Sequence, residues 1–125
     1  MAIQNEEHIW KLVDAKREEF IELSDRVFGT PETLYNEFCS VKEHIASLEI
    51  EGFKITKDVC GMPTAVIGEA GDEGPVIAIL GEFDALPGLS QEPGVASHSP
   101  ILDGGNGHGC GHNLLGSAAL LAATA

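Results

Sequence analysis

The first part of the chain carries apolar residues every three or four positions, which is the period of one face of a helix. Asn5 is a suitable cap, two glutamates follow it in the first turn, and Gly29 ends the pattern. The pattern predicts one helix over residues 5–29. Its apolar face consists of Ile9, Leu12, Val13, Phe20, Val27 and Phe28.

A second helix is predicted over residues 30–52. Thr30 followed by Pro31 is a typical start signal, and Gly52 is a natural stop. The apolar positions again alternate spacings of four and three: Leu34, Phe38, Val41, Ile45 and Leu48. The charged runs of both helices fall mostly on the opposite faces, where a solvated surface explains them.

From Phe53 the period changes to two, which is typical of β-strands. Apolar and polar residues alternate from Phe53 to Val59, and the run TAVIG follows at residues 64–68. The turn signal GDEGP then leads into PVIAILGEF, a continuous apolar run at residues 75–83. A run of this kind predicts a central strand that is buried on both faces.

Beyond this strand, residues 84–111 are rich in Gly, Pro and Ser and too long for a simple connection, which favours a functional loop. A helix is predicted to begin near His112 and to cross over the sheet. Its sequence, NLLGSAALLAATA, is apolar nearly all round, as expected for a helix buried between layers. The fold class is therefore α/β, with two N-terminal helices packed on a mixed sheet. The chain supplies too few layers to cover the last helix, so we expect it to associate with itself or with another polypeptide.

Charge and composition exclude several classes of partner. The chain has 20 acidic and 7 basic residues and a formal net charge of -13, which opposes binding to nucleic acid or to an anionic membrane. The N-terminus lacks a positive region followed by an apolar run, and no apolar stretch is as long as a membrane span, which indicates a cytoplasmic protein. Three cysteines make a poor disulfide framework, and Cys39 and Cys60 are expected to be small buried residues.

The third cysteine lies in GGNGHGCGHN, at residues 104–113. His108, Cys110 and His112 stand two apart, so in extended backbone they point to one side, and the glycines between them permit tight turns close to an ion. Together with Asp84 at a strand end, they suggest a metal site for zinc, manganese or cobalt. Two other interpretations stay open: a simple turn with solvated histidines, and a phosphate loop. The phosphate loop is disfavoured because neither G-x-G-x-x-G after a strand nor a P-loop lysine is present.

GEFDALPGLSQ (residues 81–91) and NGHGCGHNLLG (residues 106–116), in this order, resemble the metal-dependent amidohydrolases that include hippurate hydrolase, aminoacylases and carboxypeptidase G. Within this family the two motifs are most similar to the aminobenzoyl-glutamate branch. The resemblance covers the whole chain but only the N-terminal part of the family's length. It implies that residues 1–125 form the N-terminal portion of a zinc-peptidase-like catalytic domain, with no second domain in this chain.

The resemblance assigns roles to particular residues. Cys110 and His112 correspond to metal ligands, and the metal is zinc or manganese, with cobalt possible. Asp84 corresponds to the acidic catalytic residue behind the metal, which orients a ligand or tunes the site. His108 corresponds to a residue that supports the site or contacts the substrate.

Three positions depart from the family pattern and leave the metal count open. Glu82 stands where carboxypeptidase-like relatives have a ligand histidine, so it is either a substitute ligand or a strand-end residue with a structural hydrogen bond. Asn113 replaces the Asp that commonly follows C-G-H, and is a further candidate near the metal. Leu115 replaces a further histidine, and these changes favour the aminobenzoyl-glutamate branch.

The implied function is metal-dependent hydrolysis of an amide bond in a small N-acyl or N-aminobenzoyl amino acid. In the family, the general base belongs to a Glu-Glu pair after the C-G-H helix, and this chain has none there. We therefore expect the 125-residue chain to be inactive alone and to form homo-oligomers or to associate with the missing downstream part. The alternatives are a non-catalytic metal-binding or assembly module, from a fragment or a split enzyme, and a thiol redox protein. The latter is disfavoured because Cys110 has no C-x-x-C partner.

Overall fold

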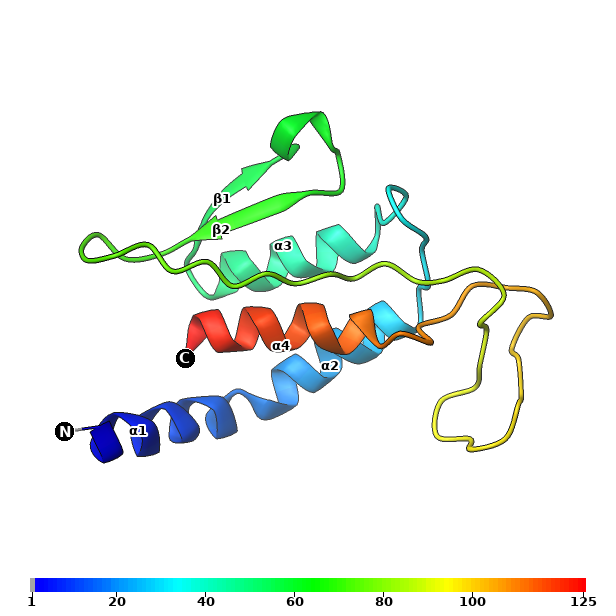
Figure 1. Ribbon diagram of the computed structural model, residues 1–125, viewed down its shortest axis with the longest axis horizontal. Helices are drawn as coiled ribbons and strands as arrows, with labels where there is room; N and C mark the ends of the chain where they lie inside the picture. Colours follow the sequence, from blue (N-terminus) through cyan, green and yellow to red (C-terminus); the bar gives the residue numbers. More distant parts are fainter. Residues whose placement is uncertain (1) are drawn as a thin grey trace.

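The computed structural model describes residues 2–125, with side chains described from Asn5 onward. Over these residues three helices, α2, α3 and α4, pack against one another, a β-hairpin packs against α3, and α1 extends away from them (Figure 1). This arrangement confirms the α/β class. The elements in chain order are α1 (Ala2–Ala15), α2 (Arg17–Phe28), α3 (Ser40–Ile50), β1 (Lys54–Lys57), the 3-10 turn η1 (Val59–Gly61), β2 (Val66–Glu69) and α4 (His112–Thr124).

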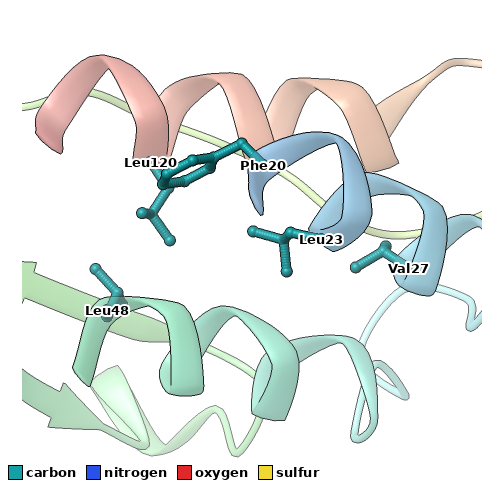
Figure 2. Close-up of a cluster of buried hydrophobic side chains, with 5 residues drawn as sticks. All are labelled: Phe20, Leu23, Val27, Leu48 and Leu120. Atoms are coloured by element: carbon teal, nitrogen blue, oxygen red, sulfur yellow. The ribbon is translucent and has the colours of Figure 1, made fainter. Parts of the chain in front are cut away.

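The hydrophobic core lies where α2, α3 and α4 meet (Figure 2). Its buried members come from all three helices: Phe20, Leu23, Val27, Leu48 and Leu120. Phe53, Ile55 and Val66 of the hairpin region pack against this cluster from outside. The core therefore packs α2, from the first part of the chain, against α4, and fixes the position of α4 relative to α2.

The first predicted helix is in fact two helices, because the chain leaves helical geometry at Lys16. This residue has φ -103° and ψ 5°, and its ammonium group pairs with Glu51 just after α3. The break separates a packed helix, α2, from α1, in which Ile9 and Trp10 remain 47% and 61% exposed. The predicted apolar face is thus buried only in its second half.

The second predicted helix begins ten residues later than its start signal indicated, at Ser40. Residues 30–39 form turns that are tied to the segment after residue 83, since Thr33 forms a parallel bridge with Ala85. Glu32 explains the late start of α3. Its carboxylate accepts hydrogen bonds from the backbone N–H of Cys39 (2.9 Å) and of Ser40 (2.8 Å) and from the Ser40 hydroxyl (2.9 Å). It thereby satisfies donors at the start of α3 that have no partner within the helix.

Glu32→Gln is expected to lower the free energy of unfolding by about 1 kcal/mol near neutral pH, the usual size of a helix cap. Burial raises the pKa of Glu32, but the hydrogen bonds from Ser40 and Cys39 outweigh it and hold the pKa below its ordinary value of 4.5. The stabilisation is therefore complete above pH 4.5 and is lost as the pH falls through the lower folded pKa. Urea denaturation at pH 7 and well below pH 4.5 measures both effects.

The matched control for this cap is Glu49→Gln, on the exposed side of the same helix. It should change stability by less than about 0.5 kcal/mol at either pH. Equal losses in the two variants, or a Glu32 effect that grows on acidification, would contradict the cap.

The β-hairpin forms in the region where the spacing of apolar residues changes to two. β1 and β2 pair antiparallel with Lys54 opposite Glu69 and Lys57 opposite Val66. Gly68 faces the core so closely that a Cβ there would lie 2.5 Å from a methyl group of Leu48. Both predicted strands are confirmed, although each is only four residues long.

The prediction of a buried central strand at residues 75–83 is wrong for this structure. The segment runs across the molecule past α3 and α4 (Figure 1) but pairs with no strand among residues 2–125. Val76, Ile77 and Leu80 are 99%, 81% and 86% exposed. A central strand needs a partner strand on each edge, and the sheet described here has only the two strands of the hairpin.

The last predicted helix is confirmed, since α4 begins at His112. Its buried side faces α2 and α3, whereas Leu114 and Leu115 are 64% and 43% exposed, so it is not enclosed between layers. None of the helices over residues 2–125 combines the length and the apolar character that a bilayer span requires. Cys39 and Cys60, expected to be buried, are both exposed, because Cys39 precedes α3 and Cys60 lies in the η1 turn.

Candidate metal centre

Three of the candidate residues meet where the extended segment ends and α4 begins. Nδ1 of His112 lies 2.7 Å from Oδ1 of Asp84, and its Nε2 lies 3.1 Å from Oε2 of Glu82. Glu82 and Asp84 are two apart on extended backbone, so their side chains share one side, while Phe83 between them stacks on the ring of His44. The imidazole of His112 thus lies between the carboxylates of Glu82 and Asp84.

Backbone hydrogen bonds hold this arrangement from two sides. The N–H of Ala85 donates to the carbonyl of Glu32 at 2.7 Å. Leu86 and Gly107 exchange two backbone hydrogen bonds of 3.0 Å, which pin the glycine-rich stretch to the residues after Asp84. A Cβ at Gly107 would lie 1.8 Å from the carbonyl oxygen of Leu89, so the close approach of these two chain segments requires glycine.

The turn into α4 also depends on glycine. Gly111 has φ 77°, in the left-handed region, immediately before His112. At Gly116, one turn into the helix, a Cβ would meet the carbonyl oxygen of Glu82 at 2.8 Å and Nε2 of His44 at 2.7 Å. The absence of a side chain at Gly116 therefore lets the Glu82 backbone lie directly on α4.

The donor set fits a divalent metal ion. One ligand atom from each of Glu82, Asp84 and His112 lies within 4.8 Å of the others. A neutral imidazole, the form that binds a metal, has a single N–H, so in that form His112 would donate to only one of its two carboxylate neighbours. If Nδ1–H donates to Asp84, the lone pair on Nε2 faces the Glu82 carboxylate, and an ion between them would satisfy both. Carboxylate oxygen and imidazole nitrogen suit zinc, manganese and cobalt.

Cys110, the second predicted ligand, lies outside this cluster. Its thiol is exposed, and among residues 2–125 the group that brings three ligand atoms together consists of Glu82, Asp84 and His112. Cys110 belongs to a turn in which the N–H of Gly111 donates to the carbonyl of His108 at 3.0 Å. The structure therefore brings the two carboxylates and His112 together, and leaves the Cys110 thiol outside this group.

His108 and Asn113 anchor the glycine-rich stretch to α2. The Nε2 of His108 lies 3.1 Å from the carbonyl oxygen of Val27, and burial lowers the pKa of this histidine. The Asn113 amide donates to the hydroxyl of Ser24 at 3.0 Å. Both side chains are buried and form these hydrogen bonds with residues of α2.

A cavity of about 370 Å³ opens beside the cluster. Glu82 and Asp84 line it together with Glu37 and Thr64. Its apolar walls are Leu34, Ala65, Val66 and Phe83. The sequence pattern placed Glu37 inside a predicted helix and did not single it out. Its spacing of three from Leu34 and four from Val41, which sets a carboxylate beside that helix's apolar face, is the signal that could have found it.

Comparison with known proteins connects this site to a class of enzyme. No family model matches the chain. A search of curated proteins finds 49% identity over 114 residues, 90% of this chain, to a hydrolase, and the resemblance predicted from the two motifs is thereby confirmed. That relative is a subunit of the p-aminobenzoyl-glutamate hydrolase of Escherichia coli (strain K12). The chain spans 24% of the relative's length.

Proposed function

We propose that this chain contributes metal ligands to an enzyme that hydrolyses the amide bond of an N-aminobenzoyl or N-acyl amino acid, p-aminobenzoyl-glutamate being the first candidate. The observation that carries the proposal is the meeting of Glu82, Asp84 and His112 beside a cavity. The relative's name supplies the substrate class. The metal is proposed to be zinc or manganese, with cobalt as a third candidate.

A bound ion would polarise the amide carbonyl and make a water molecule more acidic. The chain's own residues prepare that site. Asp84 Oδ1 lies 2.7 Å from Nδ1 of His112, where it would accept a hydrogen bond from Nδ1–H and so favour the tautomer whose Nε2 lone pair is free to bind metal. Glu82 presents a carboxylate oxygen to the same place, 3.1 Å from Nε2. We assign Cys110 as an additional thiolate ligand, which the glycines on both sides of it permit to turn toward the cluster.

The remaining catalytic groups are proposed to come from outside these 125 residues. By the resemblance, the general base would belong to a Glu-Glu pair that follows the helix equivalent to α4. The exposed apolar side chains of residues 76–80 and of Leu114 and Leu115 support association with further polypeptide, either the rest of the protein or a second copy. The relative is itself named as a subunit, which also supports an assembly. Residues 1–125 are accordingly proposed to be part of a catalytic domain.

A chimera tests this function. The matching segment of the Escherichia coli relative is replaced by this chain, and hydrolysis of p-aminobenzoyl-glutamate is measured with added manganese or zinc. We expect turnover by the chimera that a chelator abolishes, a loss of at least about a hundredfold in His112→Ala, and no turnover by the 125-residue chain alone. The matched control is His98→Ala, an exposed histidine in the same loop.

Two results would contradict the proposal. Chelator-resistant turnover by the chimera would exclude a metal-dependent reaction. Turnover by the short chain that survives purification and disappears in Cys110→Ser would show that the general base lies within residues 1–125. A chimera that binds metal but turns over no amide would favour the metal-binding or assembly module.

A further inference from the structure

Glu37 is a buried carboxylate without a partner. It is 5% exposed, and its Oε2 has no hydrogen-bond partner among the residues that the structure describes. Such a group is costly, because an ionised carboxylate removed from water needs donors or a cation. Glu37 follows the turn at Tyr35, where φ is 64°, and precedes α3, whose Val41 N–H donates to the Glu37 backbone carbonyl at 2.9 Å. The backbone around Glu37 is thus fixed, whereas its carboxylate remains unsatisfied.

Glu37 contributes to the wall of the cavity beside the candidate metal centre. Glu37 lines the cavity of about 370 Å³ together with Glu82 and Asp84. It lies outside the group of three residues whose ligand atoms are within 4.8 Å of one another, so it is a separate acidic position on the cavity wall. Apart from Thr64, the other side chains lining the cavity are apolar.

This lining selects a ligand by its chemistry. An ionised carboxylate only accepts hydrogen bonds, and no lysine or arginine among residues 2–125 lines the cavity to neutralise it. The volume and the apolar walls suit an aromatic ring or a short hydrocarbon body, since a cavity of about 150 Å³ already holds benzene. The complementary ligand therefore has an apolar body that carries an N–H donor.

We propose that Glu37 determines specificity by accepting a hydrogen bond from an amino group of the ligand whose amide bond lies at Glu82, Asp84 and His112. The identity of that ligand as an aminobenzoyl amide rests on the proposed function, because an aminobenzoyl group is an aromatic ring that carries an amino group. The recognition itself requires neither metal nor turnover. It is therefore testable on the 125-residue chain.

The experiment compares two probes that differ only in the amino group, 4-aminobenzamide and benzamide. Each is titrated into the metal-free, ¹⁵N-labelled chain, and binding is followed by the backbone amide signals of Glu37, Thr64 and Ala65. We expect 4-aminobenzamide to bind on the order of tenfold more tightly than benzamide, as for a hydrogen bond to a charged acceptor. Equal affinities, or no binding of either probe, would overturn the proposal.

Two variants assign the preference to Glu37. Glu37→Met keeps the length and removes the acceptor, and should abolish the preference while benzamide binding stays unchanged. Glu37→Gln keeps the size and a neutral acceptor, and should reduce the preference to about threefold or less. Glu69→Gln, at an exposed position of strand β2, is the control and should leave the preference intact. If Glu37→Met does not fold, Glu37→Gln decides: a full preference in that variant contradicts the proposal. Failure of amide hydrolysis would not affect this result.

Discussion

The double variant Cys110→Ser, His112→Ala is expected to weaken zinc binding by on the order of a thousandfold or more. Structural zinc sites contribute roughly 10–16 kcal/mol from about four ligands, so two ligands account for several kcal/mol. The loss of Cys110 removes a negative charge and a soft donor, and the loss of His112 removes the residue that joins Glu82 to Asp84. Elemental analysis and chelator competition measure the effect. Unchanged metal content would contradict the assignment.

The control for this variant is Cys60→Ser, His98→Ala, which changes the same residue types at exposed positions away from the cluster. It should retain full metal content. Asp84→Asn is expected to be milder than the double variant, about 10-fold to 100-fold in metal affinity, because Asp84 orients the ligand His112 through Nδ1. A loss in Asp84→Asn as large as in the double variant would instead make Asp84 a direct ligand.

Leu23→Ala is expected to destabilise the chain by about 3 kcal/mol or more, as for other large-to-small changes in a packed core. Leu23 is 1% exposed and lies in the core with Val27, Leu48 and Leu120 (Figure 2). Because the same core fixes α4 against α2, the variant should also lose the site geometry at His112. Urea denaturation followed by circular dichroism measures the stability.

Ile21→Ala is the matched control on the same helix. Ile21 is 43% exposed, and alanine is a better helix former, so the expected change is below about 1 kcal/mol. Similar losses in the two variants would show that α2 does not pack through the face that carries Leu23.

The sequence predicted the part of the site that depends on local spacing. Glu82 and Asp84 stand two apart at the end of an apolar run, and His112 follows a glycine-rich turn at the start of a helix. These signals predicted Asp84 and His112 as neighbours in function, and their side chains meet at 2.7 Å. The ligand role of Cys110 stays a prediction. A spacing of two along the chain does not by itself distinguish His108, Cys110 and His112. The structure separates them: His108 turns to α2, Cys110 to solvent and His112 to the carboxylates.

Contacts between distant segments account for what the sequence did not reveal. Residues 30–39 have a helix start signal and helical spacing, but Glu32 caps α3 and its backbone binds Ala85, far along the chain. At the break between α1 and α2, Lys16 pairs with Glu51, 35 residues away. The apolar run at residues 75–83 predicted a central strand, but burial on both faces needs neighbouring strands that residues 2–125 do not provide.

X-ray absorption spectroscopy at the zinc edge of the zinc-loaded chain tests the proposed metal centre most directly. A site made by Cys110, His112 and a carboxylate predicts one sulfur neighbour at about 2.3 Å and nitrogen or oxygen neighbours at about 2.0–2.2 Å. The sulfur contribution should vanish in Cys110→Ser and persist in Cys60→Ser. A wild-type spectrum with nitrogen and oxygen neighbours alone, or a sulfur neighbour that survives in Cys110→Ser, would contradict the proposed ligands.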